Sequence, residues 1–283
     1  DEAFMVAEAQ KMYHDISPET GEFIDFMIEH ELMDLENKPN KANTGYMTSL
    51  PDYKAPFVFS CFNHTIFDME VLSHELGHAF AGYRAMRHQP IIDYAGVSTD
   101  IAEIHSMSME QFCYPYAERF FGDKADKYRF QHLQEAITFV PFGVAVDEFQ
   151  HIIYENPNLT PKERTYEWHK LEEKYMPWRR YTDDPFMERG GYWYHKIHIF
   201  LYPFYYINYT LTAMGAMEFK KRYAEDKKKA FADYLALCDA GGSKSYLELL
   251  KVAHLRVPFE EGSVKEAISY AKDILLDSIE KMK

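Results

Sequence analysis

His74, Glu75 and His78 form the pattern in this 283-residue chain that most directly implies chemistry. Two histidines four positions apart project from the same face of a helix, one turn from each other. This spacing lets two imidazole nitrogens bind a single tetrahedral zinc ion, as in the HExxH pattern of metalloproteases. Glu75 follows the first histidine, so we expect its carboxylate beside the metal, where it can take a proton from a zinc-bound water.

The flanks of the motif indicate a buried helix over residues 68–87. Gly77, inside the motif, is a poor helix former, and it suits a point where another backbone or a substrate strand approaches closely. The remaining neighbours of the motif are apolar, at Val71, Leu72, Leu76, Ala79 and Phe80. We therefore expect this helix to lie within the core of the protein.

The third ligand separates the classes of zinc site. Metzincins carry a glycine and a histidine three and six positions after the second motif histidine, but this chain has Ala81 and Arg84 there. That class is excluded, and the alternative is a glutamate from a following helix. Glu103 lies 25 positions after His78 (103 − 78), which leaves room for a loop and a returning helix. Glu110, on the same helix face, is either a carboxylate that orients a ligand imidazole or an ordinary solvated charge.

A polar aromatic group follows within a predicted helix over residues 190–218. Its members recur at roughly helical spacing, which predicts that they share one helix face: His198, Tyr202, Tyr205, Tyr206 and Tyr209. A core stripe is the ordinary interpretation, but such stripes more usually consist of Leu, Ile and Phe, without so many hydroxyls to satisfy. We therefore interpret His198 and Tyr209 as functional residues.

Two short β-branched or aromatic runs precede the motif, at residues 45–50 and 57–62, and predict a small hairpin or sheet. Gly45 and Tyr46 lie in the first run, where an exposed edge would bind the backbone of a substrate by strand addition. An ordinary hairpin without that role fits the pattern equally well. Helical patterns fill almost all of the remaining chain, so the expected fold is mainly α, in one compact unit, with this small β-element before the motif helix.

The composition narrows the range of partners. A formal net charge of −14 disfavours nucleic acid and anionic membranes. A run of about 18 apolar residues is absent, so no membrane span is expected. Cys61, Cys113 and Cys238 are widely spaced and form no CxxC pair, which is typical of reduced thiols in the cytoplasm.

On these residues the chain resembles the oligoendopeptidase F and thimet oligopeptidase family of zinc metallopeptidases. The matching segments are 74–80, Glu103 in its helix, Gly45-Tyr46 and 198–209. The resemblance implies a cytoplasmic enzyme with an almost all-α, zincin-type fold, in which two lobes enclose a deep channel with zinc at its floor. It further implies that residues 1–283 form a single catalytic domain, the C-terminal part of a longer peptidase whose N-terminal lobe completes the channel.

The resemblance also implies roles for individual residues. His74, His78 and Glu103 would bind one Zn²⁺ per chain, with Glu75 as the general base. A histidine and one or two tyrosines would stabilise the tetrahedral intermediate. His198 matches that histidine, and Tyr209 is the best match for the main tyrosine, one turn after Tyr206; Tyr205 stays open as an alternative. The residues expected to contact substrate are Gly45, Tyr46 and Tyr205.

The function expected from the sequence is zinc-dependent endopeptidase activity on internal bonds of short oligopeptides, with Glu75 activating the water. One rival is a helical zinc carboxypeptidase, which carries the same ligands and would need a cationic group to hold the substrate C-terminus. The other is a catalytic fragment that binds zinc and peptides without cutting them. Product mapping separates the first rival from the endopeptidase, and an activity assay separates the second.

Overall fold

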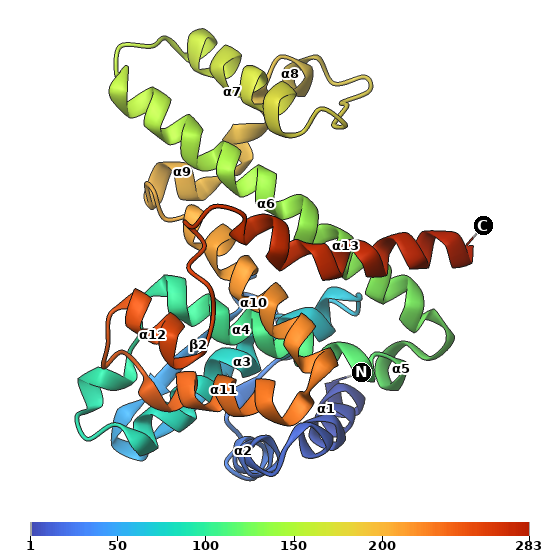
Figure 1. Ribbon diagram of the computed structural model, residues 1–283, viewed down its shortest axis with the longest axis vertical. Helices are drawn as coiled ribbons and strands as arrows, with labels where there is room; N and C mark the ends of the chain where they lie inside the picture. Colours follow the sequence, from blue (N-terminus) through green and yellow to red (C-terminus); the bar gives the residue numbers. More distant parts are fainter. Residues whose placement is uncertain (1, 283) are drawn as a thin grey trace. The chain divides into compact units, whose positions relative to one another are not determined.

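The structure of the protein is a computed structural model that describes residues 2–282 (Figure 1). Its contacts divide the chain into two compact units, which are described one at a time below. Unit 1 consists of Asp1–Leu133 and Thr212–Lys283, and unit 2 consists of Gln134–Leu211. The mainly α fold with one small sheet, expected from the sequence, is confirmed. The single domain over residues 1–283 stays a prediction.

Unit 1 contains the helix that carries the motif. Its elements in chain order are α1 (Glu2–Ile16), α2 (Pro18–Glu29), β1 (Met33–Asp34), β2 (Tyr46–Leu50), β3 (Ala55–Phe59), α3 (Phe67–His88), α4 (Thr99–Cys113), α5 (Glu118–Phe121), the first part of α6 (Ala125–Glu155), most of α10 (Ile207–Glu225), α11 (Lys227–Ala240), α12 (Tyr246–Val252) and α13 (Ser263–Met282). The predicted motif helix over residues 68–87 thus matches α3 to within one residue at each end.

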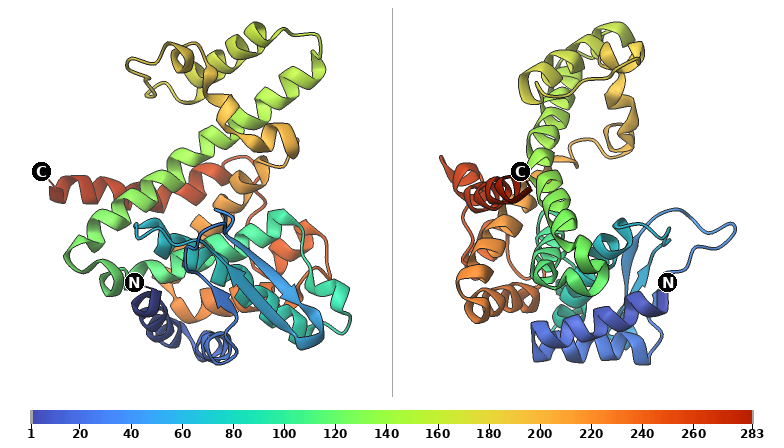
Figure 2. Two further views of the ribbon diagram at one scale, coloured as in Figure 1. Left: turned by 180° about the vertical axis from the view of Figure 1, so that it is seen from behind. Right: turned by 90° about the vertical axis from the view of Figure 1, so that its right-hand side faces the viewer.

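The sheet has the order β1-β3-β2, with β2 antiparallel and β1 parallel to β3. The predicted pair of strands is therefore confirmed, and the short β1 adds a third. Helix α2 ends at Glu29, and the chain turns at Glu31 with a positive φ before β1 begins. Strands β2 and β3 both pack against α3 (Figure 2), and β2 forms an edge of the sheet.

The core of unit 1 surrounds α3 and α4. Leu76 and Phe80 from α3 and Ile104 and Phe112 from α4 are fully buried, and Phe80 stacks on Tyr234 from α11 with ring centroids 6.2 Å apart. Burying one such apolar side chain contributes roughly 1.5–3 kcal/mol. The motif helix is therefore held on its apolar side by neighbouring helices, as its flanks predict.

Unit 2 has a separate aromatic core. Phe142 and Phe149 from the second part of α6 pack around Trp168 of α7, with Trp193 beside Phe149. Its other elements are α7 (Pro161–Tyr175), α8 (Pro185–Glu188), the 3-10 helix η5 (Gly191–His195) and α9 (Ile197–Leu201). Helix α6 continues through Pro141 without a break.

The segment Glu118–Glu155, which includes α6, has a mean hydropathy of 1.2 over its most apolar window and is the one described helical segment long and apolar enough to span a membrane. Length and composition are weak evidence for a membrane-spanning helix, because the core helix of a soluble protein meets the same criteria. Apolar side chains of its second half, such as Val146 and Phe149, are fully buried in the core of unit 2. Their packing gives the apolar composition a role within the fold.

Lys220, on α10, is a buried cation without an acidic partner among the described side chains. It is only 6% exposed, and its Nζ lies 3.1 Å from the centroid of the Tyr114 ring. Burial, with a smaller contribution from the charge of Arg129, lowers the pKa of Lys220 to about 7. Between about pH 7 and the usual lysine pKa, the unfolded chain therefore binds a proton that the folded chain does not, so this group makes stability rise with pH.

We expect Lys220→Met to increase the free energy of unfolding at pH 7–8 by roughly 1–3 kcal/mol, because methionine fills a similar volume without a charge to desolvate. The variant should also lose the part of the stability increase between pH 7 and 9 that Lys220 causes. Urea unfolding at several pH values measures both effects. Lys221→Met is the matched control, because Lys221 is exposed and its replacement should change stability by less than about 0.5 kcal/mol. Equal effects of the two variants would contradict the interpretation.

Candidate metal centre

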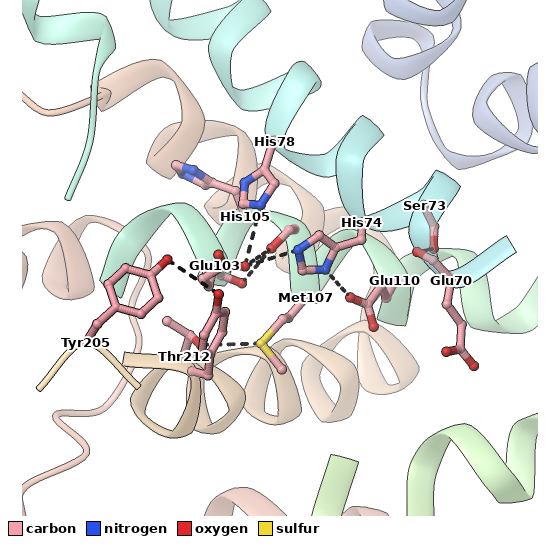
Figure 3. A network of polar contacts seen from close by, with 12 residues as sticks. Glu70, Ser73, His74, His78, Glu103, His105, Met107, Glu110, Tyr205 and Thr212 are labelled. Atoms are coloured by element: carbon pink, nitrogen blue, oxygen red, sulfur yellow. Dashed lines mark hydrogen bonds and ion pairs between the residues drawn. The ribbon is translucent and has the colours of Figure 1, made fainter. Parts of the chain in front are cut away.

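The three ligands expected from the sequence converge where α3 and α4 pack together. His74 and His78 lie one turn apart on α3, and their rings point toward Glu103 of α4 (Figure 3). Oε2 of Glu103 lies 3.2 Å from Nε2 of His74 and 3.5 Å from Nε2 of His78. One possible ligand atom from each residue lies within 4.8 Å of those of the other two. The site is therefore assembled entirely within unit 1.

These separations fit a zinc ion. Ligand atoms about 2.0–2.2 Å from a tetrahedral centre lie roughly 3.3–3.6 Å from one another. The two nitrogen–oxygen distances of 3.2 and 3.5 Å are close to that edge length. The set is also two imidazoles and one carboxylate, a donor set found in catalytic zinc sites, which leave a fourth position open. Geometry and donor types therefore both suit zinc.

Ser106 holds the third ligand in place. Its hydroxyl donates a hydrogen bond of 2.9 Å to Oε2 of Glu103, one turn earlier on α4. Burial raises the pKa of Glu103, but the nearby imidazoles of His74 and His78 outweigh it and hold the pKa well below its usual value. Glu103 is thus a buried carboxylate that stays ionised because positive charge is expected beside it. The contribution of Ser106 was not anticipated from the sequence.

Glu110 lies directly behind the first histidine. Its Oε1 is 2.6 Å from Nδ1 of His74, and its Oε2 is 2.9 Å from Nε2 of His132 on α6. Of the two interpretations open from the sequence, the structure favours the carboxylate that orients an imidazole, because Glu110 is largely buried against His74. A carboxylate on the second nitrogen fixes the ring so that the other nitrogen faces a metal.

His132 could not be found from the sequence, because it lies on a different helix, 22 positions after Glu110 (132 − 110), and no local spacing links the two.

The buried carboxylates on either side of His74 favour positive charge between them. Burial lowers the pKa of His74, but hydrogen bonds to Glu103 and Glu110 outweigh it and raise the pKa well above its usual value. Two ionised carboxylates thus act on one imidazole from opposite sides. A proton on the ring neutralises part of the charge of these carboxylates. A divalent ion among the three residues would neutralise it without protonating the histidine. The electrostatics of the site therefore favour a bound metal.

Glu75 lies beside the ligands but is not one of the convergent group. It is 8% exposed, and its Oε2 is buried without a hydrogen-bond partner among the described residues. Burial raises the pKa of Glu75. A buried carboxylate oxygen with no partner within the protein is available to a water molecule or a substrate group, so its position suits the base expected from the sequence.

The strand residues expected to bind substrate lie next to Glu75. A Cβ built on Gly45 would come within 3.2 Å of Oε1 of Glu75, so the absence of a side chain keeps that carboxylate uncrowded. Tyr46 begins the edge strand β2, is 46% exposed, and stacks on Phe59 with ring centroids 5.0 Å apart. The edge of β2 is therefore exposed, as strand addition would require.

The aromatic group lies in unit 2 and does not form the continuous helical face that its spacing predicts. That prediction was wrong: α9 ends at Leu201 and α10 begins at Ile207. Pro203 explains the break, because it has no backbone N–H and disfavours a helical conformation at Tyr202. Phe204 follows with a positive φ.

Despite this break, all five rings gather, and the ring centroid of Tyr202 lies 6.2 Å from that of Tyr205. The ring centroid of His198 lies 5.9 Å from that of Tyr205, 5.1 Å from that of Tyr206 and 6.1 Å from that of Tyr209. The hydroxyls of Tyr205 and Tyr209 are 3.4 Å apart. Burial lowers the pKa of His198, with a smaller contribution from the charge of Lys196, and both effects favour the neutral ring. Within unit 2, the turn at residues 202–206 brings together the side chains that a continuous helix would have lined up.

Comparison with known proteins places the chain in a family. A profile of peptidase family M3 matches residues 11–267. The chain belongs to peptidase family M3. Oligopeptidase PepF of Bacillus subtilis (strain 168) is 25% identical over 232 residues, which cover 80% of this M3 chain and 34% of PepF. An oligoendopeptidase F homolog of Borreliella burgdorferi is 28% identical over 195 residues, which cover 67% of the M3 chain and 32% of the homolog.

A solved structure of PZ peptidase A with an inhibitor matches 98% of the M3 chain at 49% identity and a TM-score of 0.92, and the match covers 49% of that structure. A structure named as an oligoendopeptidase F matches 97% of the chain at 50% identity and a TM-score of 0.91. The M3 chain therefore spans about half the length of these structures and about a third of the curated relatives (34% and 32%). The family resemblance noted from the sequence is confirmed.

Two glycines on α3 allow a test of how the site is assembled. A Cβ on Gly77 would lie 2.7 Å from Cα of Ser106 on α4, whereas a Cβ on Gly82 would meet its nearest atom, Cε of Met47, at 3.4 Å. Gly77→Ala should therefore force α3 and α4 apart and reduce the free energy of unfolding by roughly 1–3 kcal/mol. Gly82→Ala should increase it by up to about 1 kcal/mol, because alanine is the better helix former and fits.

Denaturant unfolding of both variants in a chelator measures these changes without a contribution from bound metal. The pair is matched, since each variant adds one methyl group to the same helix. Stabilisation by Gly77→Ala would contradict the proposed close contact between α3 and α4.

Proposed function

We propose that the chain is the catalytic part of a zinc-dependent endopeptidase that hydrolyses internal bonds of short peptides. One observation carries the proposal: in a chain of peptidase family M3, a zinc-compatible triad of His74, His78 and Glu103 lies beside a buried carboxylate oxygen of Glu75 that has no hydrogen-bond partner in the described part of the chain. The names of the relatives, oligopeptidase PepF and oligoendopeptidase F, support short peptides as substrates.

His74, His78 and Glu103 would hold the zinc ion. When bound, zinc supplies Lewis-acid chemistry, by which it polarises a carbonyl and lowers the pKa of water. Glu75 takes the proton of the attacking water and returns it to the leaving amine, so that one carboxylate serves first as base and then as acid. Glu110 keeps the ring of His74 in its binding orientation through Nδ1.

The edge of β2 would align the substrate. A peptide that pairs with this exposed strand gains backbone hydrogen bonds that do not depend on its sequence. Gly45 leaves room between the beginning of this strand and Glu75, and Tyr46 offers an exposed ring at the same place. Binding through the backbone suits an enzyme that accepts many short peptides.

His198 and Tyr209 would donate hydrogen bonds to the oxyanion of the tetrahedral intermediate. The family resemblance of residues 198–209 and the gathering of the rings around His198 support this role. Tyr206 is 6% exposed in the core of unit 2, so packing accounts for its ring, whereas Tyr205 shares a hydrogen bond with Tyr209. A single oxyanion donor typically contributes about 2.7–4 kcal/mol to catalysis.

The remainder of a longer protein would complete the substrate channel, because this chain covers about half of the matched structures. The chain by itself would then either cleave peptides or only bind zinc and peptides, and an activity assay on the chain alone separates these two outcomes.

A cytoplasmic location is proposed on the unbridged state of Cys61, Cys113 and Cys238. A peptide blocked at both termini tests the mode of cleavage, since an endopeptidase cuts it and a carboxypeptidase does not.

Glu75→Gln should keep the zinc and reduce kcat/KM on a short fluorogenic peptide by roughly 10²–10⁴-fold, because glutamine cannot accept the proton. Metal analysis and initial rates on the full-length protein measure the two effects separately. His74→Ala is the contrasting variant, and it should lose zinc together with activity. Normal turnover by Glu75→Gln would refute the assignment of the base, and full zinc occupancy in His74→Ala would refute the assignment of that ligand.

Tyr209→Phe should reduce kcat about 10²–10³-fold with little change in KM, because the lost hydrogen bond forms mainly in the transition state. Tyr205→Phe and Tyr206→Phe, measured on the same peptide, show whether a neighbouring hydroxyl has that role instead. If all three variants keep the wild-type kcat, the tyrosines belong to the core and not to catalysis.

A further inference from the structure

A cavity of about 380 Å³ extends from the metal centre along α3. His78 lines one end, and Met86, eight positions further along the helix, lines it about 12 Å away at 1.5 Å per residue. The volume is at the lower end of the range for ligand pockets, roughly 300–1,000 Å³, and suits one or two amino-acid side chains. The cavity lies wholly within unit 1.

The edge strand β2 contributes to the wall of this cavity. Met47 and Ser49 both line it, whereas Tyr46, Thr48 and Leu50 do not, as expected when alternate side chains point to opposite faces of a strand. Cε of Met47 lies close to the position that a Cβ on Gly82 of α3 would occupy. A peptide paired with the free edge of β2 would direct every second side chain to the same face as Met47 and Ser49, and hence toward the cavity.

We propose that this cavity is a specificity pocket that receives a large apolar side chain of the substrate, at a fixed position within about three residues of the scissile bond. The inference rests on the proposed peptidase function and adds a substrate preference to it. An extended chain advances about 3.3 Å per residue, so the pocket length of about 12 Å spans roughly three residues from the ligand His78.

The lining of the pocket decides the class of side chain. Apolar residues from α3 and the following segment form most of it, among them Ala81, Ala85, Ile92 and Val97. Asp93 is the one carboxylate among the lining residues, and it is exposed to solvent, where its attraction for a cationic side chain is screened. A buried apolar group gains about 25 cal/mol for each Å² removed from water, so leucine or phenylalanine is preferred over alanine.

The test is a size swap at the contact between Gly82 and Met47. The full-length, zinc-loaded protein is assayed with a set of peptides that differ in only one residue. At each position around the cut, that residue is alanine, leucine, phenylalanine, lysine or glutamate in turn. We expect the wild type to prefer leucine or phenylalanine over alanine by at least tenfold in kcat/KM at one position.

Gly82→Leu should reduce that preference at least tenfold. Gly82→Ala should reduce it less, because the smaller alanine side chain fills less of the pocket. Met47→Ala should shift the preference toward the larger phenylalanine.

His88→Ala, on the same helix but outside the pocket lining, is the control and should leave the preference ratio unchanged. The same peptides are also bound to zinc-loaded Glu75→Gln protein with and without Gly82→Leu, and fluorescence anisotropy gives Kd. This arm needs no turnover, so a failure of the catalytic proposal would not hide the pocket. An absence of side-chain preference, a preference for lysine or glutamate, or an equal effect of Gly82→Leu on all peptides would overturn the proposal.

Discussion

The close approach of α3 and α4 is the constraint on which the rest of the site depends. At Gly77 the backbone of α4 comes so near that a Cβ would lie 2.7 Å from Cα of Ser106. Because helices usually pack 8–10 Å apart according to the side chains between them, a glycine at the contact permits the shorter separation. At this separation a carboxylate of α4 reaches the same point in space as two imidazoles of α3. Ser106 contributes twice, since its backbone faces Gly77 and its hydroxyl holds Glu103.

This arrangement concentrates charge in the core, with Glu75, Glu103 and Glu110 around His74. Taken alone, such a cluster costs stability, because buried charges lose hydration that hydrogen bonds only partly replace. A zinc ion bound at the proposed site would reverse the balance, and its binding energy would contribute to the stability of the folded state. Lys220 shows a simpler form of the same cost elsewhere in unit 1, where its buried amine faces the Tyr114 ring and no acidic side chain among the described residues offsets the desolvation of its charged form.

The proposed substrate groove follows from the same helix. The face of α3 that carries His78 continues past Gly82 to Met86, and the edge strand β2 packs against α3 and lines the same cavity. The small residues of α3 between His78 and Met86 leave the cavity open between helix and strand, and larger residues there would fill it. Backbone pairing along β2 would then bind peptides of many sequences, while the cavity would select the side chain at one substrate position. General affinity would thus come from the strand edge, and specificity from the cavity beside it.

The sequence by itself determined the motif helix to within a residue, the hairpin, the family, and the carboxylate that lies with the two motif histidines, because these depend on local spacing and on residue types that few other roles explain. Tertiary structure decided what lies behind and beside the ligands. His132 and Ser106 act through contacts between elements that no local pattern encodes. The aromatic group shows the limit of periodicity: its spacing suggested one helix, but Pro203 removes a backbone donor and breaks it, and packing within unit 2 then gathers the rings through a turn instead.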